Sequence, residues 1–118
     1  MKPHVRAAIV AAALSHHGKR NVSSVYDFSA GSYHNIVASF NGQSLTAFDY
    51  TKGAHFSGTI PNLFHYGESC HIQLKHKSGD KYDGFDYGSS HHFELTIKHN
   101  GQVDFFDYGA GSYFTYKG

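Results

Sequence analysis

Short runs in which apolar and polar residues alternate fill most of the chain from residue 22 onward. Turn-forming dipeptides separate the runs, and Asn41-Gly42, Gly79-Asp80 and Asn100-Gly101 are typical of tight hairpins. This pattern predicts short antiparallel strands connected as a meander. The region before residue 22 differs, because residues 7–14 form an uninterrupted apolar run.

Residues 3–17 are predicted to form a helix. Pro3 suits a first helical turn, alanine dominates the interior, and His16, His17 and Gly18 supply a cationic last turn and a stop. The helix has one narrow apolar stripe, which suits packing on a sheet or in a groove. The stripe consists of Val5, Ile9, Ala12 and Ala13. Basic residues ahead of the apolar run also resemble the start of a secretory signal, but the run is short. A retained helix favours a cytoplasmic location.

A motif of an aromatic residue, Asp and a second aromatic residue recurs along the strand region. It occurs five times, with His replacing Asp in the third copy: Tyr26-Asp27-Phe28, Phe48-Asp49-Tyr50, Phe64-His65-Tyr66, Phe85-Asp86-Tyr87 and Phe106-Asp107-Tyr108. The central positions are separated by 22, 16, 21 and 21 residues. A Gly or Ser follows each central position after four residues, and a Tyr or His follows after six. Each unit therefore has the length of one hairpin of two short strands.

The turn residues predict a register for these hairpins. Loops such as Ser29-Ala30-Gly31 end in a glycine, as three-residue hairpin loops do. That register sets each Asp opposite the Tyr or His six positions later and puts the flanking aromatic residues on the other face, with the aliphatic core. Pro61, in the shortest of the spacings, predicts a corner, a shortened strand or an edge.

We therefore predict an all-β fold class with one short N-terminal helix. Residues 22–118 are expected to form an antiparallel meander of about ten short strands, built from five hairpin repeats of about 21 residues. The motif strands are apolar on both faces, which favours a closed barrel or a two-layer sandwich. The helix is expected to pack on the sheet and to cover an end or a face of a single domain.

Composition narrows the classes of partner. The formal net charge is +1, and only 16% of the residues are charged. The chain therefore lacks the excess of basic residues that binds a nucleic-acid backbone, and nucleic acid is not expected as a partner. No segment approaches the about 20 apolar residues of a membrane span. Cys70 is the single cysteine, which excludes an internal disulfide and a thiolate metal cluster. Histidine is abundant, with eleven residues, so the charge of the protein depends on pH.

The predicted register aligns Asp residues with His and Tyr residues in a polar row across the sheet. The candidate ligand-binding residues of this row are Asp49, His55, Asp86, His92, Asp107 and Tyr113. An Asp beside a His or Tyr can accept its hydrogen bond, so the row also has a purely structural interpretation in which it fixes the strand register. The motif aromatics have two interpretations as well, as the core or as stacking platforms for sugar rings and flat apolar ligands.

The third copy of the motif carries a metal-binding hypothesis. In the predicted register His65 faces His71, and Asp86 lies within reach across the next strand. Two imidazoles and a carboxylate can bind zinc, nickel or copper, so a divalent transition metal is the one candidate cofactor. The doublets His16-His17 and His91-His92 cannot chelate by themselves, because adjacent side chains diverge on a helix and on a strand.

Taken together, the patterns predict a non-catalytic binding or interaction module. Its repeated aromatic-Asp-aromatic units are expected to recognise a small ligand, a glycan or a protein surface. A metal-binding protein or metal-dependent enzyme that uses His65 and His71 is the first alternative, and a purely structural or assembly protein is the second. Catalysis is the less favoured class, because the chain has no nucleophile-elbow motif. The oligomeric state is left open.

Overall fold

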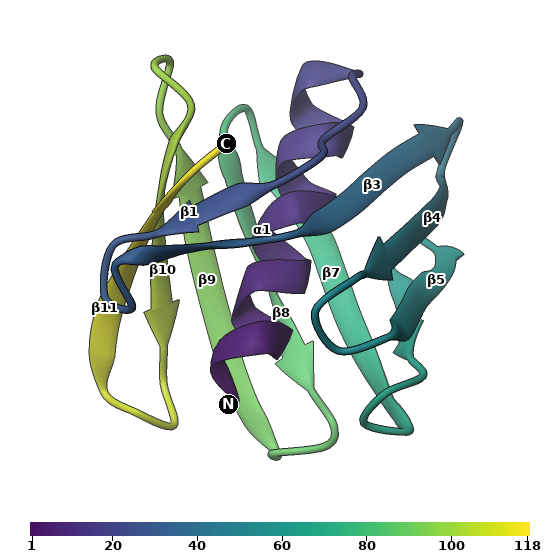
Figure 1. Ribbon diagram of the computed structural model, residues 1–118. Helices are drawn as coiled ribbons and strands as arrows, with labels where there is room; N and C mark the ends of the chain where they lie inside the picture. Colours follow the sequence, from purple (N-terminus) through teal and green to yellow (C-terminus); the bar gives the residue numbers. More distant parts are fainter.

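The computed structural model describes all 118 residues and contains one helix and eleven strands (Figure 1). Helix α1 spans Pro3–Gly18. The strands are β1 (Val25–Asp27), β2 (Ser32–His34), β3 (Ile36–Asn41), β4 (Ser44–Asp49), β5 (Ala54–Thr59), β6 (Asn62–His65), β7 (Cys70–Ser78), β8 (Lys81–Asp86), β9 (His91–Ile97), β10 (Gln102–Asp107) and β11 (Ser112–Lys117). The predicted class, a mostly antiparallel β fold with one N-terminal helix, is confirmed. No helix in the structure has the length and apolar character that crossing a membrane requires.

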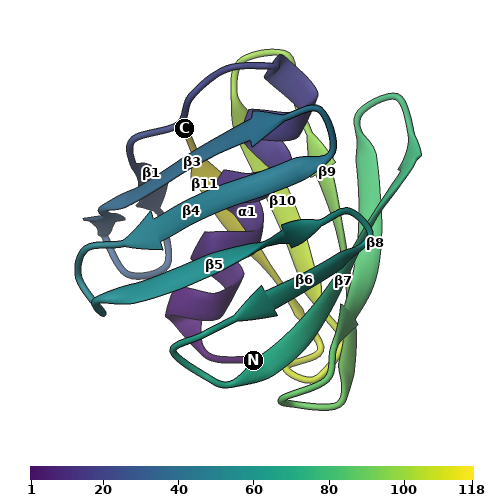
Figure 2. The same cartoon turned by 90° about the vertical axis from the view of Figure 1, so that its right-hand side faces the viewer.

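All strands belong to one antiparallel sheet that curls into a nearly closed barrel (Figures 1 and 2). Their order is β2-β1-β11-β10-β9-β8-β7-β6-β5-β4-β3, so neighbours in the sheet are mostly neighbours in the chain. The two ends of this order meet because Val22, ahead of β1, pairs with Ala38 of β3 through backbone hydrogen bonds of 2.8 and 2.9 Å. Of the two predicted architectures, the structure adopts the barrel.

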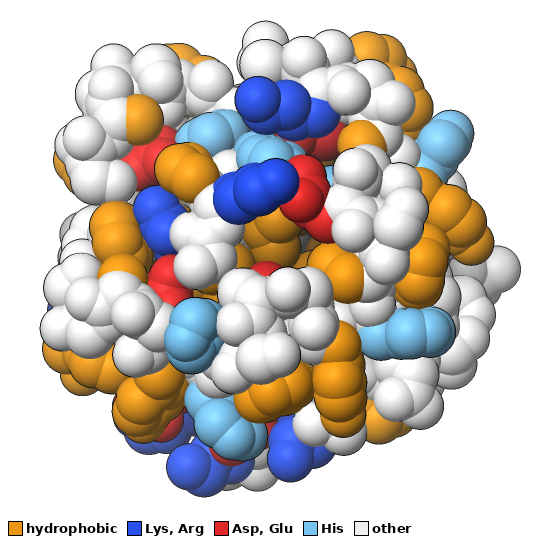
Figure 3. All heavy atoms as spheres, turned by 90° about the horizontal axis from the view of Figure 1, so that it is seen from below, with side chains coloured by type: hydrophobic (Ala, Val, Ile, Leu, Met, Phe, Trp, Pro, Cys, Tyr) orange, Lys and Arg blue, Asp and Glu red, His pale blue; other side chains and the backbone are white.

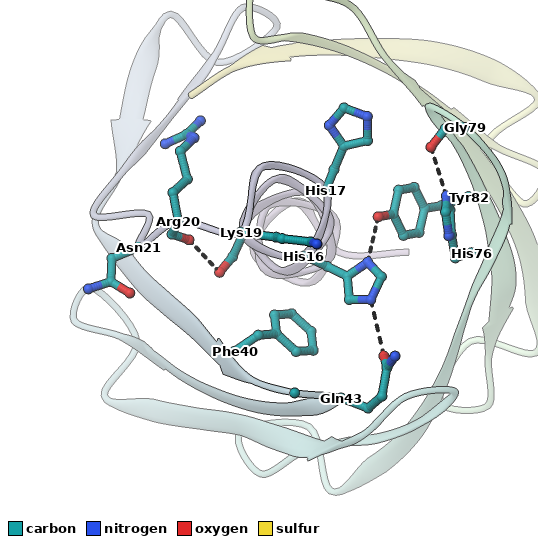
Figure 4. A pocket seen from close by; sticks show the side chains of 12 residues that line it. His16, His17, Lys19, Arg20, Asn21, Phe40, Gln43, His76, Gly79 and Tyr82 are labelled. Carbon is teal, nitrogen blue, oxygen red and sulfur yellow. Dashed lines mark hydrogen bonds between the residues drawn. The ribbon is translucent and has the colours of Figure 1, made fainter.

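Helix α1 lies inside the barrel, and not over an end or a face as the sequence suggested. Residues 5–14 are each at most 6% exposed, and a view along the helix places it in the middle of the ring of strands (Figure 4). The predicted narrow apolar stripe is therefore wrong, because every side of the helix is enclosed. Alanine makes this enclosure feasible, since side chains limited to Cβ keep the helix narrow.

The strands alternate between side chains that face the helix and side chains that face outward. Along most of the barrel the inward side chains are apolar and form one core with the helix. Two of them, Phe93 and Phe105, stack with their ring centroids 5.2 Å apart. The inward positions are Val25, Ile36, Ala38, Leu45, Ala47, Phe56, Leu63, Ile72, Leu74, Tyr82, Phe93, Leu95, Ile97, Val103, Phe105 and Tyr116.

The register of the motif hairpins differs by one residue from the predicted one. Each loop after a motif has four residues and not three, so Asp27 pairs with Ser32, and Tyr26 pairs with Tyr33. The other four motif hairpins have the same register. A slip of one residue exchanges the two faces of a strand. The Asp face is therefore the barrel interior, which it shares with the aliphatic core, and the aromatic residues beside each Asp face outward.

Two other turn predictions agree with the structure. Gly79-Asp80 forms a two-residue turn in which Ser78 pairs with Lys81. Pro61 lies in the turn between β5 and β6, and β6 is shortened to four residues. An irregularity between His76 and Ser78 shifts the register of β7 against β8. The pattern of turn residues does not predict this shift.

Enclosure of the helix predicts that enlarging an alanine on any side of it destabilises the protein. Ala11 and Ala13 point in nearly opposite directions from the helix axis, and neither is exposed. We expect Ala11→Leu and Ala13→Leu each to lower the free energy of unfolding by about 1–3 kcal/mol, measured by urea denaturation. Ala110→Leu, on an exposed loop, is the control and should leave it unchanged. A tolerated substitution at either helix position would show that side of the helix to be open.

Candidate functional site

The five loops that follow the motifs lie at one end of the barrel, which we call the motif end. The loops are residues 28–31, 50–53, 66–69, 87–90 and 108–111. Helix α1 begins at this end (Figure 1), where the amino group of Met1 lies 3.4 Å from Asp107. The central residue of every motif points into the barrel here and is at most 3% exposed. These buried polar residues are Asp27, Asp49, His65, Asp86 and Asp107.

The buried carboxylates accept hydrogen bonds from the loops that follow them. Oδ1 of Asp107 accepts the backbone N–H groups of Gly109 and Ala110 at 2.9 and 3.3 Å. The other three Asp residues accept related bonds from backbone N–H groups two or three positions later. A carboxylate in this position holds a tight turn. The recurrence of Asp in the motif therefore has a structural cause, since each Asp closes its own four-residue loop.

His65 replaces the carboxylate in the third motif. Its Nδ1 accepts the backbone N–H of Glu68 at 3.2 Å, so the ring closes its loop in the same way as Asp. Burial lowers the pKa of His65, and His4, with its ring centroid 5.7 Å away, lowers it further. The ring is therefore neutral with the proton on Nε2, and Nε2 has no hydrogen-bond partner.

Arg6 brings a positive charge to the carboxylates at the motif end. Its guanidinium lies 3.4 Å from Asp107, and its Nε donates to the hydroxyl of Tyr116 at 3.2 Å. The guanidinium also lies over the ring of Phe114, 3.7 Å from its centroid. The N-terminus of the helix carries a partial positive charge, which attracts nearby carboxylates as Arg6 does. The interior of the motif end thus contains a set of buried carboxyl groups close to the cationic start of the helix.

Asp27 and Asp49 are equally buried but differ in their partners. Oδ2 of Asp27 accepts a hydrogen bond from Nε2 of His34 at 2.9 Å, whereas Oδ2 of Asp49 has no partner. Burial raises the pKa of Asp27, but the hydrogen bonds from His34, Ser29 and Ala30 outweigh burial and hold that pKa below its usual value. Folding therefore favours the ionised form of Asp27.

The structure divides the predicted ligand-binding residues between the two faces of the barrel wall. The residues inside are Asp49, Asp86 and Asp107, and those outside are His55, His92 and Tyr113. The predicted polar row of Asp beside His and Tyr does not form. The cause is the four-residue loop, which pairs His55, His92 and Tyr113 with motif aromatics and not with the Asp residues.

The residues of the metal-binding hypothesis are separated in the same way. His65 is buried inside the barrel, whereas His71 is exposed outside it, where it pairs with Phe64. Asp86 is inside and lies 3.6 Å from the Sγ of Cys70. His, Cys, Asp and Glu residues nowhere form a group of three or more with metal-binding geometry. The structure therefore does not bring His65 and His71 to a common site.

Each motif hairpin carries a cluster of three rings on the outer surface. In each cluster the first motif aromatic packs edge to face against the second one and against the Tyr or His six positions after the central residue, with centroid distances of 4.6 to 5.0 Å. We call these the outer aromatic clusters. They are Tyr26, Phe28 and Tyr33; Phe48, Tyr50 and His55; Phe64, Tyr66 and His71; Phe85, Tyr87 and His92; and Phe106, Tyr108 and Tyr113.

The second motif aromatic is exposed in every cluster, and so are Tyr33 and Tyr113 in the first and last clusters. The exposed fractions of the second motif aromatics run from 52% for Tyr108 to 66% for Tyr50. Seen from the motif end, hydrophobic side chains gather in separate groups around the rim, with charged and His side chains between them and nearer the middle (Figure 3). The sequence motif identified these residues, but the predicted register hid their exposure because it assigned the aromatics to the core.

Polar side chains separate one outer aromatic cluster from the next. Across the sheet Phe85 pairs with Gln73, and Phe106 pairs with Glu94. The first cluster also borders a cavity of about 420 Å³ that Ser24 and Lys117 help to line. The outer surface near the motif end therefore presents exposed rings next to hydrogen-bonding groups, an arrangement that can hold a ligand with both apolar and hydroxylated faces.

Comparisons of the chain with models of protein families, with curated proteins and with solved structures find no match in any of the three.

The different partners of Asp27 and Asp49 lead to a prediction. Asp27→Asn removes the charge that His34 contacts, and we expect it to lower the free energy of unfolding at pH 7 by about 1–3 kcal/mol. Asp49→Asn is the matched control and should cost less than about 1 kcal/mol, since its amide oxygen can keep the loop bonds and its amide nitrogen replaces a partnerless oxygen.

The effect of Asp27→Asn should also depend on pH. Because the folded state holds the pKa of Asp27 below its unfolded value, the stabilisation is complete above pH about 4 and is lost as the pH falls further. Urea unfolding of both proteins between pH 7 and pH about 3 tests this. A difference between Asp27→Asn and the wild type that stayed constant over that range would contradict the role of the charge.

Proposed function

We propose that the protein is a binding module that holds a glycan chain against its outer aromatic clusters. The observation that supports this most is the repetition of one arrangement. Five hairpins each present the same edge-to-face group of three rings, and in each the second motif aromatic is more than half exposed. A polymer with a repeating unit can contact several such groups at once, which multiplies weak individual contacts.

The chemistry of each cluster suits a sugar ring. A pyranose has a face of C–H groups that packs on an aromatic ring, and a rim of hydroxyl groups that needs hydrogen-bond partners. The exposed tyrosine of a cluster offers the ring, while Tyr hydroxyls, His nitrogens and neighbours such as Gln73 and Glu94 offer the partners. A purely apolar ligand would leave these polar groups unused.

The buried Asp residues have a supporting role in this proposal. Each one fixes the loop that follows it, and its inward direction sends the residues on either side outward. The motif would then have two roles: its Asp would hold the hairpin loop, and its aromatic residues would contact the glycan. His55, His71, His92 and the equivalent tyrosines would orient the rings against which the ligand packs.

Substituting the exposed tyrosines tests the proposal. We expect the wild-type protein to bind at least one of insoluble cellulose, insoluble chitin and a soluble β-glucan in pull-down and titration assays. Tyr50→Ala, Tyr66→Ala, Tyr87→Ala and Tyr108→Ala should each weaken binding by about three- to tenfold, and the quadruple variant should lose it. Each single variant loses one edge-to-face contact at the surface, so its melting temperature should fall by only a few degrees and the protein should stay folded in the binding assay.

Lys75→Ala is the control, because it truncates an exposed side chain of β7 outside the clusters. Retention of binding by the quadruple variant, or failure of the wild type to bind any of the three glycans, would refute the proposal. Sedimentation velocity of the same proteins detects the rival function. Self-association that disappears in the quadruple variant, without glycan binding, would make the clusters an assembly surface.

A further inference from the structure

The end of the barrel opposite the motif end, which we call the open end, contains a second cavity. Helix α1 ends here, and the cavity of about 720 Å³ lies between its last turn and the strands around it (Figure 4). A volume of this size accommodates a small organic molecule. The side chains used below are His16, Lys19, Arg20, Phe40, Gln43, His76 and Tyr82, all of which line the cavity.

The lining of the open-end cavity is basic. It includes Lys19, Arg20 and three His residues, and it contains no Asp or Glu. Neither Lys19 nor Arg20 forms an ion pair within the protein. The negative end of the helix dipole lies at the same place, but it amounts to about half a charge, against two full positive charges. The cavity therefore has a net preference for an anion.

Lys19 has a backbone conformation that is uncommon for its residue type. It is the residue after the helix, with φ 49° and ψ 46°, in the left-handed region where glycine is the usual residue. A side chain at this position carries a steric cost. Figure 4 shows the Lys19 side chain lying across the end of the helix toward His16. The chain thus carries an ammonium group over the cavity at a position where glycine would end the helix with less strain.

Hydrogen bonds hold the aromatic part of the lining in place. The hydroxyl of Tyr82 donates to Nδ1 of His16 at 2.6 Å, and Nε2 of His16 donates to the Gln43 side-chain oxygen at 3.1 Å. Burial raises the pKa of Tyr82 to about 12, so this hydroxyl stays neutral and adds no negative charge. Phe40 packs edge to face on His16, with centroids 5.1 Å apart.

A second imidazole lies beside this group. The ring of His76 packs against Tyr82 with centroids 4.8 Å apart, and its Nε2 donates to the backbone oxygen of Gly79 at 2.7 Å. The rings of Phe40, His16 and His76 therefore form a preorganised aromatic side of the cavity, next to the Lys19 side chain, whereas the Arg20 side chain points toward the other side of the helix end (Figure 4).

We propose that the open-end cavity binds a small organic anion, with a phosphate or carboxylate group on Lys19 and a planar group against Phe40, His16 and His76. Arg20, on the other side of the helix end, adds to the positive potential of the cavity. This site is separate from the outer aromatic clusters, which lie near the other end of the barrel. It requires a ligand that combines charge and a flat ring, since either part alone would use only half of the lining.

Titration with model anions tests the site. Phenyl phosphate and benzoate supply both parts, inorganic phosphate supplies the charge alone, and benzyl alcohol supplies the ring alone. We expect saturable binding of phenyl phosphate or benzoate, with perturbed NMR signals of the His16 and His76 rings, and affinity at least about tenfold above that for inorganic phosphate or benzyl alcohol. Preference for one of the two identifies the anion as a phosphate ester or a carboxylate.

Variants separate the cavity from the rest of the surface. The double variant Lys19→Gln and Arg20→Gln should weaken binding of the preferred probe by at least about tenfold, and Phe40→Ala should weaken it as well. Lys52→Gln, an exposed lysine at the motif end, is the matched control and should bind like the wild type. The quadruple tyrosine variant should also bind normally, which distinguishes this site from the glycan surface.

Three outcomes would overturn the proposal. The first is absence of saturable binding of both phenyl phosphate and benzoate in the millimolar range. The second is binding that the double variant retains. The third is equal affinity for inorganic phosphate and phenyl phosphate, which would show that the aromatic side of the cavity has no part in recognition.

Discussion

Enclosure of a helix by a curled sheet is the constraint on which the other features of this protein depend. A helix with ordinary side chains is about 10–12 Å across, so a small barrel can surround it only if the helix side chains are short. Five of the seven residues from Ala7 to Ala13 are alanines, which meets this condition, and larger barrel side chains such as Phe56, Phe93 and Phe105 fill the remaining space. Because the helix is buried on all sides, the charged groups near the barrel interior lie at the two ends of the helix.

The two ends of the barrel have opposite chemical character, and the direction of the helix agrees with it. At the motif end the interior holds four carboxylates, which face the positive end of the helix dipole and Arg6. At the open end the negative end of the dipole meets Lys19 and Arg20. A reversed helix would put the negative end of its dipole beside the four buried carboxylates. The electrostatics therefore favour the observed direction of insertion, in addition to the short connection of residues 19–24 between the helix and β1.

Sequence patterns predicted the class of the fold, the barrel as one of two options, the helix, and a meander with turns such as Gly79-Asp80. They missed the register of the motif hairpins, because a loop ending in Gly31 is compatible with three or four residues, and the deciding hydrogen bonds from Asp27 are visible only in three dimensions. The difference of one residue in loop length exchanged the inner and outer faces of the motif strands. The candidate site therefore moved from the Asp residues to the aromatic residues. Enclosure of the helix was also beyond local patterns, because it depends on closure of the whole sheet.

Loop closure explains part of the motif and leaves part of it unexplained. An Asp at the end of a strand can hold its turn whatever its neighbours are. The first aromatic of each motif packs across the hairpin against a Tyr or His, and such a pair contributes about 0.5–1.5 kcal/mol. The second aromatic is more than half exposed in all five copies. This ring also packs edge to face on the first aromatic, but fold stability does not require so much of it to be exposed, and exposed rings favour aggregation. The exposure of this ring in every copy is therefore the part of the motif that the proposed ligand contact would explain.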